Sequence, residues 1–412
     1  MSTDTTLPIR LAPTNAKSVL KGLPPIVRKG FSIALNLRLG RLDVTVPDGR
    51  TFYVEAAEPG PNAVLRIHDW RFVRRLLQSG DIGVAESFMA GEWSSPDPTV
   101  FLQLFAANRD AVANALAARP MVRALLSLRH WLNSNTRRGS KRNIAAHYDL
   151  GNDFYEAWLD PSMTYSSAFF GAGANDLETA QRDKYRALAQ RTGIKPGEHV
   201  LEVGCGWGGF AEYAARELDC RVTAITISRA QHAYATRRIA EVGLSDRVTV
   251  ALTDYRDLPG RFDRIVSIEM FEAVGERYWP GYFEMLRDRL RPGGQAGLQI
   301  ITIDDRHFAR YRRSPDFIQR YIFPGGMLPP AEGVAKLGRT VGLSLMHESG
   351  FGTDYARTLS EWRERFRTAW PRLSPLGFDE RFRRMWEFYL HYCEAGFRAG
   401  SIDVRHFVFA RP

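Results

Sequence analysis

The chain has little cysteine and no long apolar stretch. Only three cysteines, Cys205, Cys220 and Cys393, occur in 412 residues, and their spacing matches neither a disulfide framework nor a metal site. No apolar run approaches the length needed to cross a bilayer, and the amino terminus lacks the apolar core of a signal peptide. These absences predict a globular protein of a reducing cytoplasm, long enough for two domains.

Acidic residues are absent over one long interval. Between Asp110 and Asp149 the chain carries no aspartate or glutamate, and the whole sequence has a formal charge of +10. The cations of this interval are Arg119, Arg123, Arg129, Arg137, Arg138, Lys141 and Arg142. Leucines and Trp131 lie among them, and such a basic, apolar mixture suits an anionic lipid surface. A solvated linker helix is the alternative, and it explains the charges equally well.

Changes of pattern divide the chain into four parts. Residues 1–30 contain several prolines and predict an irregular arm, and residues 31–118 predict a small α+β domain, with lipid binding as one interpretation of it. Residues 119–143 form a basic connector, and residues 144–412 form a larger α/β domain. In the small domain we expect a hairpin that turns at 47–49 and helices at 70–79 and 99–118.

Strands and helices alternate in the larger domain. The expected strands are 199–205, 221–227, 247–254, 262–270 and 295–303, and the expected helices are 208–216, 229–242 and 282–290. Repeated βα units predict a doubly wound, mostly parallel sheet with helical insertions, which binds ligands beyond the carboxyl ends of its strands. Near the end of the chain, Phe382, Trp386 and Tyr389 recur at helical spacing, so this stripe is either plain core or the lining of an acyl tunnel.

A glycine loop follows the first of these strands, in the stretch VLEVGCGWGGF. A dinucleotide site would need an acidic residue about 20 positions further on to bind the ribose, and residues 224–228 contain none. Glu202, directly before the glycines, would repel a pyrophosphate and attract a cation. Asp254, at the end of the third strand, could accept a hydrogen bond from an adenine amino group. Together these features resemble a class I S-adenosylmethionine-dependent methyltransferase; a nucleotide-binding or unliganded α/β domain is the alternative.

Several separated motifs make a more specific resemblance. They are HYDLGNDFYEAWLDPSMTYSSAFF, IEMFEAVGERYWPGYF, YIFPGGMLP, GFGTDYARTL and YCEAGFRAGSIDVRHFVF. From about residue 140 to its end, the chain resembles the cyclopropane-fatty-acyl-phospholipid synthase family, which includes the mycolic acid cyclopropane synthases. Residues 80–98 resemble the amino-terminal domain of the bacterial phospholipid enzymes.

The resemblance implies both a reaction and a set of cofactor contacts. The family transfers a methyl group from S-adenosylmethionine to a cis double bond in an acyl chain. By resemblance, the cofactor contacts are Tyr165, Ser166, Glu202, Gly204, Gly206, Gly208, Thr226, Ile227, Gln231, Asp254, Tyr255 and Ile268. Thr226 and Gln231 would replace the usual ribose-binding acid of the second strand.

The resemblance also implies a catalytic base, because family members hold a bicarbonate ion. Glu272 in MFEAVG and Tyr355 in GTDY match two of its side-chain ligands, and Glu272 would also stabilise a carbocation. Ser167 stands in place of a cysteine and stays a candidate catalytic residue, because serine can still hydrogen-bond an anion. Ile301 stands in place of a histidine, and isoleucine cannot bind an anion. These departures leave bicarbonate binding, and with it ring closure, in doubt. For Glu272 and Glu269 a solvated helix start is the alternative.

The sequence thus predicts an enzyme that methylates the double bond of unsaturated phospholipid acyl chains. An acyclic methyl-branched or methylene product is favoured, and a cyclopropane is the alternative. A nucleic-acid methyltransferase is a more distant alternative, because IEMFEAVG has no polar clamp for a flipped base. We expect no metal and no nucleic-acid partner, a cytoplasmic location on the inner face of an anionic membrane, and leave a homodimer open.

Overall fold

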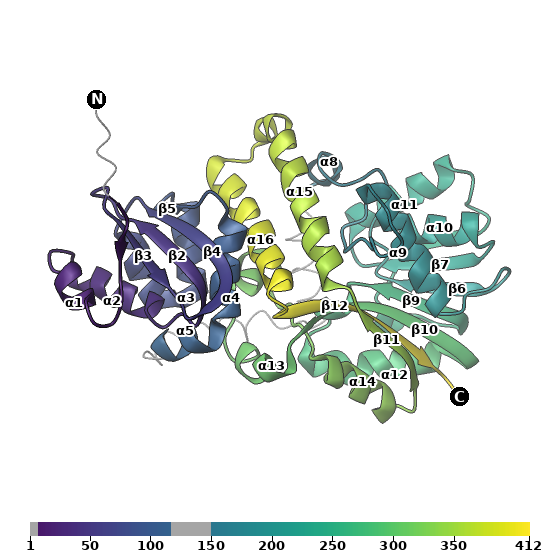
Figure 1. Cartoon of the computed structure of the whole chain (residues 1–412). Helices are drawn as coiled ribbons and strands as arrows, with labels where there is room; N and C mark the ends of the chain where they lie inside the picture. The colour runs from purple at the N-terminus through teal and green to yellow at the C-terminus, as the bar shows by residue number, and fades with distance from the viewer. Residues whose placement is uncertain (1–6, 117–149) are drawn as a thin grey trace. The chain divides into compact units, whose positions relative to one another are not determined.

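The computed structural model describes residues 7–116 and 150–412, which form two compact units (Figure 1). The first unit contains residues 7–116, 314–317 and 374–401. The second unit contains residues 150–313, 318–373 and 402–412. The basic connector expected at 119–143 lies outside the described residues.

A seven-stranded sheet lies at the centre of the second unit, in the order β11-β12-β10-β9-β6-β7-β8. Its strands are β6 (His199–Val203), β7 (Arg221–Thr226), β8 (Val248–Leu252), β9 (Phe262–Ile268), β10 (Leu290–Ile303), β11 (Ser344–Gly350) and β12 (Ile402–Ala410). The strands from β6 to β10 are parallel to their neighbours in that run, whereas β12 pairs antiparallel with β10 and β11. The predicted doubly wound, mostly parallel sheet is confirmed.

Helices cover both faces of this sheet (Figure 1). Along β6, Val200 packs into one apolar cluster and Leu201 into another, because successive side chains of a strand point to opposite faces. The helices that share the first cluster are α9 (Leu177–Arg191), α10 (Gly209–Glu217) and α11 (Arg229–Glu241). Those that share the second are α12 (Trp279–Arg289), α13 (Asp305–Tyr311) and α14 (Ala331–Thr340). The other α-helices described in the unit are α8 (Asn152–Glu156) and α15 (Gly352–Leu373).

A five-stranded sheet forms the core of the first unit, in the order β1-β3-β2-β4-β5. Its strands are β1 (Ile9–Arg10), β2 (Leu39–Thr45), β3 (Thr51–Glu55), β4 (Glu58–Ile67) and β5 (Trp93–Ser94). The antiparallel pair β2–β3 is the predicted hairpin, and Gly49 in its turn has a φ of +88°. Glycine adopts this left-handed conformation without the steric cost that other residues meet.

The prediction of an irregular arm is wrong for the described residues before 31. Besides β1, this part contains the helix α1 (Ala16–Val19) and most of α2 (Pro25–Ala34). Pro25 is the first residue of α2, where a proline lacks only an N–H that would have no partner in the helix. Val27 and Phe31 are buried, so the proline begins an amphipathic helix here instead of preventing one.

The helices expected in the first unit are present, with different limits. They are α3 (Arg71–Met89), α4 (Pro98–Ala107) and α5 (Arg109–Leu116). The first of them ends at residue 79 as expected, because Gly80, with a φ of +58° and a ψ of −129°, is not helical and separates it from a second helical segment of α3. Ile82 and Phe88 beyond Gly80 are buried, and this burial holds the second segment in place.

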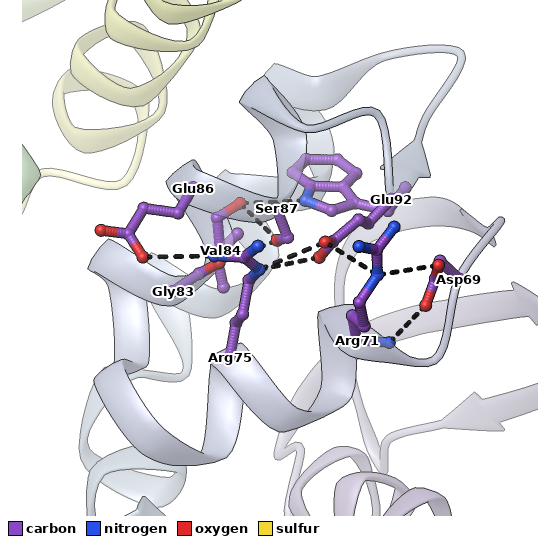
Figure 2. A network of polar contacts seen from close by, with 9 residues as sticks. Asp69, Arg71, Arg75, Gly83, Val84, Glu86, Ser87 and Glu92 are labelled. Atoms are coloured by element: carbon purple, nitrogen blue, oxygen red, sulfur yellow. Dashed lines mark hydrogen bonds and ion pairs between the residues drawn. The ribbon is translucent and has the colours of Figure 1, made fainter.

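A polar network ties the segment after α3 back to that helix (Figure 2). Glu92 is 1% exposed and its carboxylate accepts from Arg75 Nε at 3.0 Å. Arg71 Nε lies 3.5 Å from the same carboxylate. Trp93 follows and donates its Nε1 hydrogen to the carbonyl of Val84 at 3.0 Å. Because Glu92 is buried, the two arginines supply the charge compensation that it needs.

The long helix α16 (Glu380–Arg398) packs within the first unit, although the expected boundaries grouped it with the larger α/β domain. It lies against α3 and α4. Thr99 on α4 contacts His391 Nδ1 at 2.7 Å and donates to Glu394 at 3.1 Å. The helical spacing of the carboxyl-terminal aromatic residues is thus confirmed. Among the described residues, no helix is long and apolar enough to cross a membrane.

Candidate active site

The carboxyl ends of the parallel strands in the second unit bring the predicted site residues together, beginning with the glycine loop. Gly204, Gly206 and Gly208 have φ values of +84°, +52° and +86°, which glycine adopts without strain. A Cβ on Gly206 would meet no atom within 4 Å, so open space lies beside the backbone there. A Cβ on Gly209 would lie 2.5 Å from the Tyr185 hydroxyl, which explains a glycine where α9 approaches α10.

Glu202 is a buried carboxylate at the end of β6. It is 3% exposed, and its Oε2 atom has no hydrogen-bond partner. Burial raises the pKa of Glu202 to about 8, a rise that a hydrogen bond from the Ala211 backbone N–H and the charges of Lys184 and Arg238 only partly offset. A buried carboxylate oxygen without a donor is unfavourable, and a cationic ligand would compensate it, whereas a pyrophosphate would be repelled. The residue fits the charge of S-adenosylmethionine and does not fit a dinucleotide.

The residues expected to bind the ribose lie at the end of β7, which Thr226 completes, and just after it. Thr226 Oγ1 donates to Gln231 Oε1 at 2.9 Å, and Ile227 is the next residue along the chain. Ser228 caps α11, its hydroxyl accepting from the Gln231 backbone N–H at 3.3 Å. Thr226 and Gln231 are therefore neighbours, as the resemblance predicts, and both are buried.

Asp254, the expected adenine contact, lies after β8 and is already paired. Its carboxylate accepts from Arg256 Nε at 2.8 Å and from Arg256 Nη2 at 2.6 Å. An adenine amino group would have to share this carboxylate with the guanidinium, which the sequence did not reveal. Next to it, the ring of Tyr255 meets that of Tyr282 edge-on at 5.3 Å, and Ile268 ends β9.

Glu269, directly after β9, collects three hydrogen bonds. Its Oε1 accepts from the Ser167 backbone N–H at 2.8 Å and from Gln299 Nε2 at 2.7 Å, and its Oε2 accepts from the Tyr355 hydroxyl at 2.7 Å. The residue has a φ of +49°, a conformation that is strained for glutamate. Desolvation raises the pKa of Glu269 despite these donors.

A chain of hydrogen-bonded side chains orients Gln299 toward Glu269. His406 Nε2 lies 2.9 Å from Gln299 Oε1, and Arg191 Nη1 contacts His406 Nδ1. Because arginine can only donate, His406 accepts at Nδ1 and carries its hydrogen on Nε2. Burial lowers the pKa of His406 well below its usual value, which keeps it in this neutral form. Gln299 must then accept with its oxygen and present its amide N–H to Glu269.

Glu272 does not share these donors, contrary to the grouping with Ser167 and Tyr355 that the resemblance implies. It accepts from the Ile301 backbone N–H, while its other oxygen, Oε2, is buried and has no hydrogen-bond partner. Burial, and then repulsion by Glu269, raise the pKa of Glu272 to about 8. The Ser167 hydroxyl donates to the Ala168 carbonyl at 2.9 Å, so only the Ser167 backbone reaches the site. Neither glutamate is a solvated helix start.

Aromatic rings lie around Tyr165 and Tyr355 in the second unit. Tyr165 lies 5.2 Å from Trp362 and 5.7 Å from Trp158, measured between ring centroids. Trp362, on α15, also meets the ring of Tyr355 edge-on at 6.1 Å. Trp362 is fully buried, so one side chain links the predicted cofactor contact Tyr165 to the hydroxyl donor of Glu269.

Lys184 is a cation that the sequence did not single out. It is fully buried on α9 and donates to the Ser166 hydroxyl at 2.6 Å. Burial lowers the pKa of Lys184 to about 7, against the attraction of Glu269, Asp160 and Glu202. Its position in the helical stretch LETAQRDKYRALAQR gave no signal, because a lysine in a charged helix is ordinarily solvated.

Comparison with known proteins identifies the family. The family model described as mycolic acid cyclopropane synthetase matches residues 135–407. The chain belongs to this family.

Its relatives include both methyltransferases and cyclopropane synthases. The tuberculostearic acid methyltransferase UfaA1 of Mycobacterium tuberculosis is 39% identical over 86% of this chain and 85% of that protein. The cyclopropane-fatty-acyl-phospholipid synthase of Escherichia coli is 34% identical over 90% of this chain and 96% of that protein.

The solved structure of the mycolic acid cyclopropane synthase CmaA1 with SAH and CTAB superposes with a TM-score of 0.62. It is 30% identical and covers 66% of this chain and 98% of that one. The chain is accordingly a class I S-adenosylmethionine-dependent methyltransferase, and S-adenosylmethionine is its cofactor. The unpartnered Oε2 atom of Glu202, beside the open glycine loop, fits that cofactor.

Proposed function

We propose that this family member transfers the methyl carbon of S-adenosylmethionine to the cis double bond of unsaturated phospholipid acyl chains. The observation that carries the proposal is a pair of desolvated carboxylates, Glu269 and Glu272, in a unit that also packs aromatic rings around Tyr355. The names of the relatives support a fatty acyl substrate: one is a tuberculostearic acid methyltransferase and another a cyclopropane-fatty-acyl-phospholipid synthase.

The chemistry of an alkene demands such surroundings. When bound, S-adenosylmethionine supplies an electrophilic methyl group, and the alkene accepts it by placing positive charge on a chain carbon. The faces of Tyr165 and Trp362 can stabilise that charge by cation–π attraction. The unpartnered Oε2 of Glu272 can stabilise it electrostatically in the ionised form of the residue, which a nearby cation favours, because a carboxylate acts more strongly where water is excluded.

We infer an acyclic product, methylated or methylenated, instead of a cyclopropane. If the base removes a proton from the new methyl group while the adjacent carbon is cationic, a ring closes. If a hydride first moves along the chain, or the proton comes from the chain, an olefin forms. At two positions where the family has side chains that hold the bicarbonate base, this chain offers none: Ile301 donates only its backbone N–H, to Glu272, and the Ser167 hydroxyl donates to the Ala168 carbonyl. A saturated methyl branch would need a separate reductase.

Lipid analysis of cells that express this chain tests the proposal. The host should lack its own cyclopropane synthase, and its fatty acids should be compared with those of a host carrying an empty vector. We expect a new acyl species, isomeric with a cyclopropane acid, that disappears on catalytic hydrogenation and is cleaved by ozone. A species that resists both treatments would support the cyclopropane alternative, and methyl groups found in RNA but not in lipid would reject the proposal.

Membrane association is part of the proposal, because the substrate is a bilayer lipid. The formal charge of +10 and the acid-free interval from Asp110 to Asp149 favour an anionic surface. We propose that the chain works from the cytoplasmic side and binds the membrane peripherally.

A further inference from the structure

We propose that Glu269 is the resident catalytic base, and that its carboxylate takes the position and the hydrogen-bond donors that a free bicarbonate ion would otherwise use. This inference rests on the proposed function and specifies which group removes the proton. It departs from the assignment that the resemblance gives, in which a bound anion is the base and Glu272 one of its ligands.

The donors around Glu269 carry the inference. The Tyr355 hydroxyl and the Ser167 segment were expected to bind bicarbonate, and both donate instead to Glu269, at 2.7 Å and 2.8 Å. A carboxylate and a bicarbonate ion present the same planar pair of oxygens to such donors. Because each donor hydrogen is already engaged with Glu269, a second anion would meet the Glu269 charge and find no free donor there.

The backbone of Glu269 supports a functional assignment. A non-glycine residue with a φ of +49° is strained, and such strain persists where the surrounding structure enforces it. The enforcing contacts are the three donors to the carboxylate and the backbone bond from the Glu269 N–H to the Gln299 carbonyl at 2.8 Å. The strained backbone thus fixes the position of the Glu269 carboxylate. A glutamate with a purely structural role on the protein surface would not require such strain.

One lone pair of Glu269 remains for chemistry. A carboxylate has about four acceptor positions; Oε1 uses two, for Ser167 and Gln299, and Oε2 uses one, for Tyr355. Glu269 as a whole residue is half-buried, and we assign the remaining position on Oε2 to the reaction. In the proposed step a C–H bond of the alkyl cation breaks, its electron pair forms the carbon–carbon π bond of the olefin, and the proton moves to Oε2. The proton returns to solvent when the product leaves.

Two substitutions at Glu269 test the inference. Glu269→Gln keeps the shape and removes the base, so we expect methyl transfer to unsaturated phosphatidylglycerol vesicles to fall about 100-fold or more. Glu269→Gly relieves the positive φ, should fold, and leaves the donors free. Its activity should be low and should recover about tenfold or more when formate, acetate or bicarbonate is added. Binding of S-adenosylmethionine by calorimetry and the thermal midpoint should stay near the wild-type values in both variants.

The controls separate this inference from the proposed function. Glu241→Gln, an exposed residue on α11, should leave activity unchanged, and wild-type turnover should be the same in buffer freed of bicarbonate. If the wild-type chain transfers no methyl group to lipid, the proposed function fails. Given an active wild type, any one of three results would show that Glu269 is not the base. Either Glu269→Gln retains its turnover, or the wild type needs added bicarbonate, or Glu269→Gly responds to none of the three anions.

Discussion

Individual carboxylates in the second unit differ in what compensates their burial. Glu269 receives three protein donors, whereas one oxygen of Glu202 receives none. A group left without a donor in the ligand-free chain is a natural place for a charged ligand, because the ligand removes a desolvation cost that the protein otherwise bears. Glu202 is therefore the residue on which cofactor affinity should depend most strongly.

Cofactor affinity should rise with pH through the ionisation of Glu202. The pKa of Glu202 in the folded chain is about 8, above the ordinary 4.5. Between these two pKa values Glu202 is ionised in the unfolded chain and protonated in the folded chain. Its contribution to stability therefore falls as pH rises through this interval and is constant above both pKa values. Binding a cation favours the carboxylate form, so S-adenosylmethionine binding should release a proton.

We predict that the Kd for S-adenosylmethionine falls about tenfold or more from about pH 6 to about pH 8. Calorimetry in buffers of different ionisation enthalpy would detect the released proton. Glu202→Gln should raise the Kd about 30-fold to 100-fold at pH 8, the loss of a charge-assisted contact of about 2–3 kcal/mol, and should abolish the pH dependence. An unchanged pH dependence in Glu202→Gln would assign the titration to another group.

Tyr355→Phe should move the pH profile of turnover without abolishing it. The hydroxyl donates to the charged form of Glu269, so its removal raises the pKa of that carboxyl further. Turnover falls as the pH drops through the pKa of the base. In Tyr355→Phe this fall in turnover should begin at a pH about one to two units higher than in the wild type. An equal loss of turnover at every pH would mean that Tyr355 acts in some other way.

At the residue scale, the sequence predicted the identities of the motif residues better than their partners. Thr226 and Gln231 meet as expected. Glu269 and Glu272 lie in one motif, and nothing in that motif reveals which of them meets Tyr355, a residue far along the chain. That choice depends on the backbone conformation at Glu269 and on Gln299 and His406, which approach from β10 and β12.

At the scale of elements, strand and helix periodicity predicted most of the strands and helices of the second unit. The strands from β6 to β10 and their helices follow the expected order, because buried parallel strands are apolar throughout. The expected strands did not include β12, although its pairing with β10 extends from Ile303↔Ile402 to Gln295↔Ala410. Helix α16 was expected as a helix, but an apolar stripe does not say which neighbour it packs on, and it packs in the first unit.

The segment after α3 should depend on the Glu92 network (Figure 2). Glu92→Ala removes the buried partner of Arg75 and Arg71, whose own side chains are 36% and 61% exposed. Because those arginines can turn to water, we predict a loss of about 1–3 kcal/mol in the free energy of unfolding, less than for a fully buried pair. Chemical denaturation measures it, with the exposed Glu58→Ala as the matched control; equal stability of both variants would contradict this role.

At the scale of the whole molecule, the excess of basic residues should govern membrane binding. We predict that the chain sediments with vesicles containing phosphatidylglycerol, more weakly with purely zwitterionic vesicles, and that added salt releases it. Replacing Arg137, Arg138 and Arg142 together by glutamine should weaken binding by about 1 kcal/mol for each charge removed near the surface. Salt-independent binding would indicate that apolar contacts dominate.

The most direct test of the account follows the methyl carbon itself. Purified chain would be incubated with S-adenosylmethionine carrying a trideuterated, carbon-13 methyl group and with vesicles of an unsaturated phosphatidylglycerol, and the acyl chains examined by carbon-13 NMR. The account predicts labelled carbon in the acyl chain, as a methylene carbon that has lost one deuterium or as a methyl group on an olefin that has kept all of them. Label in a cyclopropane ring would contradict the inferred product, and absence of label from acyl carbons would contradict the proposed function.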